Sequence, residues 1–317
     1  MLSPEFVFPF RQNTVDVLNW VIDQSPDWKP RYYLGLIYWS RNNQARAKEL
    51  FTQCGDPDFS AFYAARATLM QGDKYPNDLR RAAQLNPSEW RYGKMLVDHF
   101  IETKRFDEAL TTAKQYKTRF PQDFRISMLL AKTLLLNKQY KACSDLLDKT
   151  TILPYEGATD GRQLYREAWL MQAVQQIQQE KYKTSLASVS KARLWPESLG
   201  VGKPYDEDID DRLEDYLEGI CFEKTKKADE AVNKWNEIIS HKRSFNNATT
   251  LVTALALSKT NRGEEGKTLL SAWLQKEPEN KLARWCYDIY TNNSNQPDTN
   301  FEGDENFRIL KALVGKP

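Results

Sequence analysis

The stretch LGLIYWSRNNQARAKELF, residues 34–51, carries the pattern that decides the fold. Two segments with helical spacing of apolar residues are separated there by a polar turn at residues 41–44. Gly35 precedes Ala47 by twelve residues, and Phe51 follows Ala47 one helical turn later. A small residue is expected where two helices cross closely, and an aromatic ring fills the space beside it. The stretch therefore predicts a hairpin of two packed helices.

The same arrangement recurs near the other end of the chain. Gly219 precedes Ala231 by twelve residues, and Trp235 follows at the position equivalent to Phe51. This pattern resembles the signature of the tetratricopeptide repeat, in which L-G-x-x-Y is followed by A-x-x-x-F. The resemblance implies a right-handed α-solenoid, in which the first helices of successive hairpins line a concave surface that binds partners.

Weaker copies of the hairpin fill the rest of the chain. Apolar residues recur at i, i+3, i+4 and i+7 almost throughout, and no long alternating pattern predicts a strand. The prediction is an all-α chain of about seven hairpins, one of them irregular with helices near 61–70 and 75–85, and a last helix near 282–290. The small residues expected at the helix crossings are Ala47, Ala109, Cys143, Ser185, Ala231 and Thr268.

Two insertions interrupt the regular spacing of these small residues. The intervals between consecutive crossing residues rise from 34 to 42 and then to 46 between Ala109 and Ala231. The additional residues predict two long inter-repeat loops near 152–161 and 195–206. We therefore expect a solenoid over 1–290, a flexible linker over 291–303 and a short capping helix over 304–317. The alternative for this last helix is a segment that docks on a partner.

A narrower resemblance involves the two loops. They are similar to the C-terminal repeat region of some large bacterial tetratricopeptide proteins that carry an N-terminal β-rich domain of unknown function. The similarity implies that this chain is the repeat portion of something longer, and it brings no activity with it. The residues that carry it are Pro154, Tyr155, Glu156, Gly157, Gly161, Arg162, Tyr165 and the stretch from Trp195 to Asp206.

Composition excludes several classes of protein. The chain has 45 basic and 43 acidic residues, a near balance that argues against nucleic-acid binding through bulk charge. No segment approaches the roughly 20 apolar residues of a membrane span. The N-terminus has neither the basic nor the apolar region of a signal peptide, so a cytoplasmic location is favoured, or a periplasmic one within a longer secreted protein.

The sequence offers no catalytic or metal-binding motif. Its four cysteines are far apart and its two histidines lack zinc-ligand spacing, so buried structural thiols are expected. The stretch from Gly200 to Lys203 lacks the first glycine and the hydroxyl residue of a phosphate-binding loop, which favours a turn. The acidic run at 206–211 lacks the glycine and glutamate of a calcium loop, which favours a helix start. We expect no cofactor, no metal and no enzymatic activity.

The remaining hypothesis is a scaffold that binds a protein or peptide in its groove. Aromatic and arginine side chains are typical anchors of such interfaces. Lys94 is followed one turn later by Asp98, whose charge opposes a clamp for a peptide carboxylate. The groove positions that the repeat implies are Tyr32, Trp39, Arg91, Lys94, Arg125, Lys132 and Tyr216. For Tyr32 and Trp39, packing within the hairpin is the alternative.

The second hypothesis places a site on the two long loops. Aromatic faces combined with a few polar groups suit a sugar or another small ligand. The chain is then a glycan-binding or ligand-binding accessory module, or the helical region of a larger bacterial enzyme. The expected loop residues are Tyr155, Glu156, Arg162, Trp195, Lys203 and Tyr205. A monomer or a weak homo-oligomer is compatible with both hypotheses.

Overall fold

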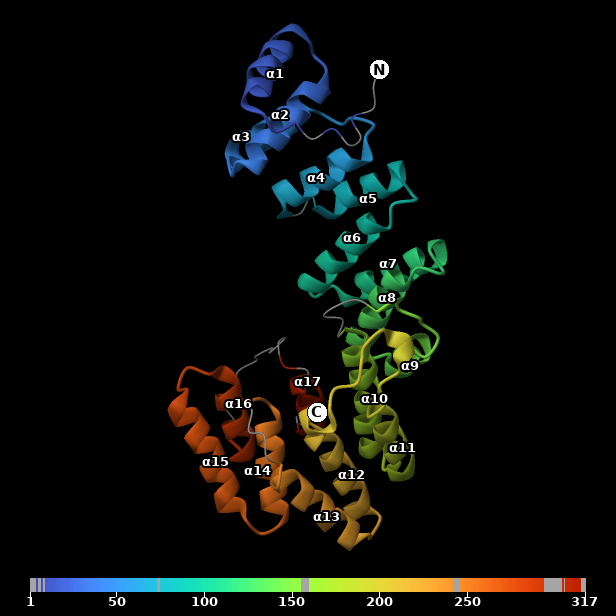
Figure 1. The fold of residues 1–317 in the computed structure, drawn as a ribbon, viewed down its shortest axis with the longest axis vertical. Helices are drawn as coiled ribbons and strands as arrows, with labels where there is room; N and C mark the ends of the chain where they lie inside the picture. Colours follow the sequence, from blue (N-terminus) through green and yellow to red (C-terminus); the bar gives the residue numbers. More distant parts are fainter. Residues whose placement is uncertain are drawn as a thin grey trace. The chain divides into compact units, whose positions relative to one another are not determined.

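The computed structural model describes residues 4, 7, 9–72, 75–154, 160–241, 246–293, 304 and 306–314. Throughout these residues the secondary structure is helical (Figure 1). The chain divides into two compact units, residues 1–133 and residues 134–317. We describe each unit by itself.

Unit 1 consists of consecutive helices that pack as hairpins. The pairs α2 with α3, α4 with α5 and α6 with α7 each lie side by side, and α1 precedes them against α2. Helix α8 begins in unit 1 and ends in unit 2. The helices are α1 (Gln12–Gln24), α2 (Trp28–Ser40), α3 (Gln44–Gln53), α4 (Ser60–Met70), α5 (Tyr75–Leu85), α6 (Trp90–Glu102), α7 (Phe106–Arg119) and α8 (Phe124–Leu136).

Unit 2 continues the same arrangement with longer connections. The pairs α10 with α11, α12 with α13 and α14 with α15 form hairpins, and the first helices α10, α12, α14 and α16 lie next to one another in that order. Its helices are α9 (Tyr140–Leu147), α10 (Asp160–Gln178), α11 (Tyr182–Ala192), the short 3₁₀ helices η2 (Glu197–Leu199) and η3 (Asp206–Asp208), α12 (Arg212–Lys224), α13 (Ala228–Ile239), α14 (Thr249–Lys259), α15 (Gly263–Lys276), α16 (Lys281–Tyr290) and α17 (Phe307–Val314).

The contact that the repeat signature predicts is present in both units. A Cβ atom on Gly35 would lie 2.7 Å from the ring of Phe51, and one on Gly219 would lie 2.4 Å from the ring of Trp235. In these two hairpins the first helix therefore comes as close to the second as a glycine allows. The expected all-α array of sequential helical hairpins is confirmed.

One crossing residue differs from the prediction. Thr268 is exposed, whereas Gly266 is buried. A Cβ atom on Gly266 would lie 2.5 Å from the hydroxyl oxygen of Tyr290 and 2.8 Å from the carbonyl oxygen of Ala254. The crossing therefore lies two residues earlier than the sequence spacing suggested. Gly266 is the fourth residue of α15, as Ala47 is of α3 and Ala231 is of α13.

A recurring backbone turn ends the first helix of most hairpins. The residue two positions after the helix has a positive φ, and the next backbone N–H donates to a carbonyl in the last turn, as Lys227 does to Phe222 at 2.9 Å. This arrangement satisfies helix-end carbonyls that would otherwise have no partner. The positive-φ residues of this series are Asn42, Lys104, Lys138, Glu180, Lys226, Asn261 and Asn292, with φ between 53° and 61°.

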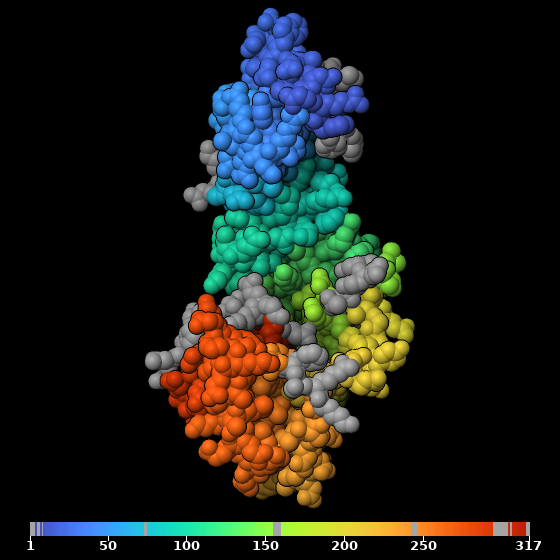
Figure 2. All heavy atoms as spheres, turned by 60° about the vertical axis from the view of Figure 1, so that its left-hand side comes forward, coloured from blue at the N-terminus to red at the C-terminus, as the bar shows by residue number. Residues whose placement is uncertain are grey.

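The last helix, α17, lies inside unit 2. It packs against α10, and the ring of Phe307 contacts Trp285 of α16 with centroids 4.8 Å apart. In Figure 1 it lies between α10 and the helices α14 and α16. In the view of Figure 2, only a small red area of it is visible among the orange atoms of the last hairpins. The helix therefore packs against α10 and α16, which are first helices of unit 2.

Among the described helices, none has the length and apolar character needed to cross a membrane.

Candidate functional site

The expected groove aromatics of unit 1 belong largely to its core. Tyr32 is only 6% exposed, and its ring contacts those of Phe51 and Phe62. Trp39 is half-buried and, with Phe10 and Leu36, lines a hollow of about 460 Å³. Tyr32 is therefore a packing residue and not an accessible groove residue, because its ring fills the space between consecutive hairpins.

The expected groove cations of unit 1 are exposed but paired. The guanidinium of Arg125 lies 4.0 Å from the ring centroid of Trp90 and bonds Asp123, which holds the pKa of that carboxyl below its usual value. Arg91 pairs with Glu89 at 3.0 Å. Asp123 and Glu89 therefore offset the positive charge that Arg125 and Arg91 would need to hold the carboxylate of a bound peptide.

The other two expected cations lie on α6 and α8. The ammonium of Lys94 lies 2.5 Å from the carboxylate of Asp98, so the opposing charge that the sequence indicated is in direct contact. Lys132 is exposed on α8.

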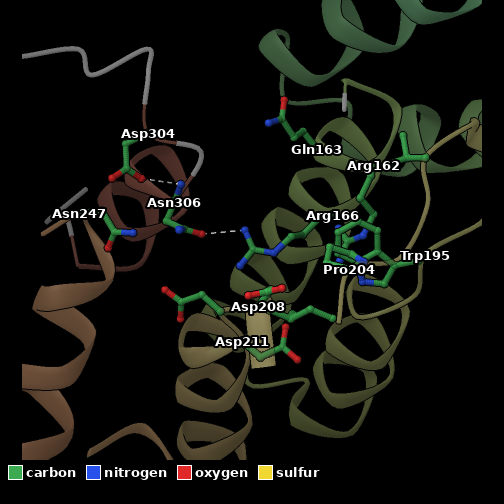
Figure 3. Close-up of a pocket in the computed structure, with 13 residues that line it drawn as sticks. Arg162, Gln163, Arg166, Trp195, Pro204, Asp208, Asp211, Asn247, Asp304 and Asn306 are labelled. Carbon is green, nitrogen blue, oxygen red and sulfur yellow. Dashed lines mark hydrogen bonds between the residues drawn. The ribbon is translucent and has the colours of Figure 1, made fainter. Parts of the chain in front are cut away.

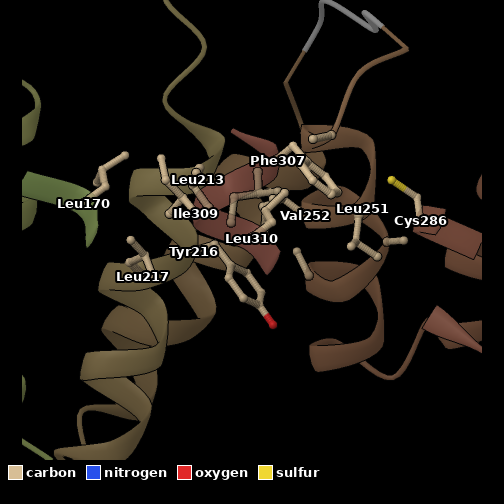
Figure 4. Close-up of a cluster of buried hydrophobic side chains, with 14 of the residues drawn as sticks. Leu170, Leu213, Tyr216, Leu217, Leu251, Val252, Cys286, Phe307, Ile309 and Leu310 are labelled. Atoms are coloured by element: carbon tan, nitrogen blue, oxygen red, sulfur yellow. The ribbon is translucent and has the colours of Figure 1, made fainter. Parts of the chain in front are cut away.

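In unit 2, the first helices form a surface that holds α17, which we call the α17 face. Phe307, Ile309 and Leu310 are almost fully buried in a cluster that includes Leu213, Leu217, Leu251 and Val252 (Figure 4). Tyr216 belongs to the same cluster, with its ring 5.2 Å from that of Trp235. Burial raises the pKa of Tyr216. Tyr216 is therefore a packing residue beneath α17 and not the exposed groove residue that the sequence predicted.

Polar contacts fix the direction of α17 on this face. Arg308 donates to the Glu167 carboxylate of α10, with Nε 2.6 Å from Oε1. Arg166 of α10 donates to the side-chain oxygen of Asn306 at 2.7 Å, and Asp304 accepts the backbone N–H of Ala248 at 2.8 Å. The α17 face therefore recognises a short amphipathic helix by apolar anchors and matched charges.

The two long loops meet one another. The N–H of Ile152 donates to the carbonyl oxygen of Ser198 at 2.7 Å. A Cβ atom on Gly161 would lie 2.9 Å from the carbonyl oxygen of Leu199, and Gly200 has a φ of +70° where it passes Ile152. The expected turn at Gly200 is therefore present, and the second loop packs over the start of α10. Tyr155 and Glu156 of the first loop lie outside the described residues.

A cavity of about 430 Å³ lies between the second loop, α10 and the residues that precede α17 (Figure 3). Arg162 and Trp195 form one side, with the guanidinium 4.4 Å from the ring centroid. Arg166, Asn247, Asp304 and Asn306 line the other parts. The cavity thus combines an aromatic ring, side-chain amides and charges of both signs, a composition suited to a polar ligand.

Ion pairs surround the cavity. Buried Arg166 pairs with the fully buried Glu214 at 2.6 Å, and Arg212 pairs with Asp210 at 2.7 Å. Burial alone would raise the pKa of Asp210, but hydrogen bonds from Arg212 hold it below its usual value. Burial and the nearby Glu214 raise the pKa of Asp211, although Arg193 bonds it at 2.7 Å. The acidic run thus forms ion pairs with neighbouring segments as well as preceding α12.

The structure brings together only some of the expected loop residues. Arg162 and Trp195 are in contact and line the cavity. Tyr205 is 78% exposed, and Lys203 pairs with Asp206 at 2.7 Å outside the cavity lining. The cavity residues Asn247, Asp304 and Asn306 were not anticipated, because they come from distant positions and carry no motif. Within the described residues, no group of histidine, cysteine and acidic side chains is arranged to hold a metal ion.

Comparisons with known proteins agree on the fold. No protein-family model matches the chain, and no curated protein matches it. The structure of Naa15/Naa10 bound to HypK-THB is similar over 88% of this chain, with 13% identity and a TM-score of 0.52. The chain spans 42% of the length of that structure's matching chain.

Two bacterial structures are also similar. A tetratricopeptide repeat protein from Parabacteroides merdae matches 88% of this chain and 99% of its own, with 11% identity and a TM-score of 0.45. The C-terminal part of a repeat-containing protein from Cytophaga hutchinsonii matches 85% and 92%, with 11% identity and a TM-score of 0.43. These comparisons give no support to the expected N-terminal β-rich context. Identities this low show the fold alone, and that fold is a tetratricopeptide-type array of helical hairpins.

Proposed function

We propose that this chain is a non-enzymatic scaffold that binds a protein or peptide segment on the α17 face of unit 2. Folds of this type are typical of binding scaffolds and usually lack catalytic activity. Because a fold does not fix a function, the proposal rests on one observation of the site. The α17 face holds an amphipathic helix through Phe307, Ile309 and Leu310, and beside that helix it leaves an open groove of about 490 Å³ lined by residues of α10 and α17.

The chemistry of this contact is that of a helix bound in a groove. Apolar side chains one turn apart enter the surface, and an Arg–Glu pair sets the orientation. Of the three similar structures described above, the one with the highest TM-score is a protein complex, Naa15/Naa10 bound to HypK-THB. The exposed cations Arg91, Lys94, Arg125 and Lys132 of unit 1 are a second contact surface in this proposal.

Site-specific photo-crosslinking in host cells tests the proposal. A photoreactive benzoylphenylalanine replaces Met171 on α10, which lines the groove beside α17, or Val232 on α13, which is exposed on a second helix. We expect one protein to be captured from position 171 and not from position 232. Equal capture from both positions, or capture from neither, would contradict the proposal. If the double variant Arg91→Ala, Arg125→Ala binds the partner with unchanged affinity, unit 1 is not part of the binding site.

A second candidate function is supported by the 430 Å³ cavity. Its size is within the range of small-molecule sites, and Trp195 with Asn247 and Asn306 offers the stacking and amide groups that a sugar or polar metabolite uses. A thermal-shift screen of sugars and polar metabolites tests it, with Trp195→Ala as the variant and Tyr205→Ala as the control. A ligand that stabilises the wild type and the control but not Trp195→Ala would support this function. If no compound shifts the melting temperature, the candidate is wrong.

A further inference from the structure

Helix α1 of unit 1 packs on α2 through one face and leaves another face exposed. Val15 belongs to a buried cluster with Leu34 and Ile37 of α2, and Leu18 and Ile22 pack against this cluster. Residues three and four apart are neighbours on a helix, so Val15, Leu18 and Ile22 form the packed face of α1. The residues outside this stripe decide what else the helix can contact.

The exposed face of α1 carries two large apolar side chains. Val17 is 59% exposed and Trp20 is 66% exposed, and they lie one helical turn apart. Of the large apolar residues that are exposed in the described part of the chain, these are the only two that share a helix. Contiguous apolar surface of this kind is typical of protein contact sites. The indole of Trp20 is therefore accessible to a partner.

Two carboxylates lie beside the indole. Asp16 precedes Trp20 by four residues and Asp23 follows it by three, so each is its neighbour on the surface of α1. Both are exposed, and neither forms an ion pair within the residues that the structure describes. Helix α1 itself contains no lysine or arginine. The exposed tryptophan thus lies between two negative charges that this helix does not neutralise.

The nearest described cations lie at the other end of the helix. Arg11 directly precedes α1, with its guanidinium 5.8 Å from the ring centroid of Phe10. Arg41 donates to the side-chain oxygen of Gln12, the first residue of α1, at 2.5 Å. Asp23 is in the last turn, where the helix carbonyls already carry partial negative charge. The C-terminal part of the exposed face is therefore acidic and suits a cation.

We infer that the exposed face of α1 docks a basic amphipathic segment of a protein partner, with an apolar side chain on Val17. An arginine or lysine of that segment lies over the indole of Trp20 and pairs with Asp16 or Asp23. Tryptophan is the side chain whose ring attracts a cation most strongly, and the two carboxylates add to this attraction. The surface belongs to unit 1, so the inference goes beyond the function proposed for the α17 face.

The charges on this face argue against other occupants. A second copy that docked through the same face would bring Asp16 and Asp23 close to their own counterparts, which repel them. An anionic membrane or a nucleic acid would be repelled for the same reason. A protein segment with an apolar side chain between basic ones is the occupant that matches both the apolar and the acidic parts of the face.

Fluorescence anisotropy with the full chain tests the inference. The probe is a rhodamine-labelled peptide, Gly-Arg-Leu-Ala-Gln-Leu-Leu-Ala-Arg-Gly, whose arginines are seven residues apart, as Asp16 and Asp23 are. One comparison peptide has glutamate in place of both arginines, and the other has serine in place of the three leucines. The comparison peptides separate the contribution of charge from that of apolar contact.

The variants change exposed side chains, so they leave the packed face of α1 intact. Asp16→Lys and Asp23→Lys reverse one charge each, and Trp20→Leu keeps apolar surface while it removes the ring face. The matched control is Glu102→Lys, because Glu102 is an exposed carboxylate in the last turn of another helix of unit 1, α6. Circular dichroism and the melting temperature verify that each variant is folded.

We expect saturable binding of the arginine probe to the wild type and to Glu102→Lys. Asp16→Lys and Asp23→Lys should each weaken it by about tenfold, which corresponds to roughly 1.4 kcal/mol. Trp20→Leu should weaken it by about threefold, because the cation loses the ring. The double variant Asp16→Lys, Asp23→Lys should bind the glutamate peptide in place of the arginine probe, which a merely structural role of these residues would not produce.

Several results would overturn the inference. These are no binding of the arginine probe to the wild type, equal binding of the glutamate peptide, an equal loss in Glu102→Lys, or unchanged binding in Trp20→Leu. A mass of two chains in light scattering that returns to one chain in Asp23→Lys would identify a second copy as the occupant and would also overturn it. Crosslinking from position 171 tests the α17 face separately, so each proposal can fail without the other.

Discussion

Replacement of Gly219 by alanine tests the contact that defines the hairpin. The added Cβ atom would lie 2.4 Å from Cη2 and 2.5 Å from Cζ3 of Trp235, and ordinary contact begins near 3.4 Å. The indole would have to move by roughly 1 Å, yet it is buried and lies against Tyr216. Overpacking of this kind costs about 1–3 kcal/mol.

The intrinsic preference of the helix acts in the opposite direction. Alanine is better than glycine inside a helix by about 1 kcal/mol. We place the steric cost in the upper part of its range because rigid ring atoms are the contact, and expect a net loss of about 1–2 kcal/mol. Gly263→Ala is the control, because the nearest atom to its Cβ would be 3.6 Å away.

Urea unfolding followed by circular dichroism measures the effect. The Gly219→Ala variant should unfold at lower urea than the wild type, and Gly263→Ala should not. A second substitution, Trp235→Phe, removes the ring atoms nearest the new Cβ, so the double variant should lose less stability than the two single losses combined. A Gly219→Ala variant as stable as the wild type would refute the close helix crossing.

Four further predictions concern unit 2 and the buried thiols. Phe307→Ala should destabilise unit 2 by about 3–5 kcal/mol, measured by urea unfolding, because its ring is buried on the α17 face; a loss below about 1 kcal/mol would contradict this burial. Glu214→Ala should cost about 3–5 kcal/mol in the same assay, because it leaves the buried Arg166 without its carboxylate partner; a neutral effect would contradict that ion pair. Burial raises the pKa of Cys54 and Cys143 from 9.0 to about 12. The contribution of these two thiols to stability should therefore be constant below about pH 9 and be lost between about pH 9 and pH 12, where the unfolded chain has already lost these protons. Titration with a thiol reagent at pH 8 should label neither cysteine before unfolding, and rapid labelling would contradict their burial.

The hairpins could be predicted because their determinants are local. Gly35 and Phe51 lie 16 residues apart, as do Gly219 and Trp235, and each pair meets in the structure. The spacing of small and aromatic residues is enough to specify a crossing between two consecutive helices. The irregular hairpin of α4 and α5 also lies close to its predicted range, because its helices show the same apolar period.

The turns between the helices gave weaker signals. Residues such as Lys104 and Glu180 adopt the positive φ that glycine or asparagine usually provides, so their identity does not reveal the turn. The sequence spacing predicts a crossing at Thr268, whereas the structure places it at Gly266. Both are small residues on the same helix, so their identity does not distinguish them. Only the tertiary contact with Tyr290 distinguishes them.

The candidate site depends on contacts between distant parts of the chain. The apolar face of the last helix was visible in the sequence, but its position on α10 was not, because more than 100 residues separate Arg308 from Glu167. Asn247 and Asp304 line the cavity from separate segments with no shared pattern. Tyr32 has the composition of a groove anchor, and only its burial shows that it packs in the core.

Hydrogen–deuterium exchange tests the central claim most directly. The partner that crosslinking identifies is purified separately and added in excess to the full chain, and exchange is compared with and without it. The account predicts slower exchange in α10 and α17, which border the groove on the α17 face, and unchanged exchange in the second helices α11, α13 and α15. Protection confined to the second helices, with α10 and α17 unchanged, would contradict the account.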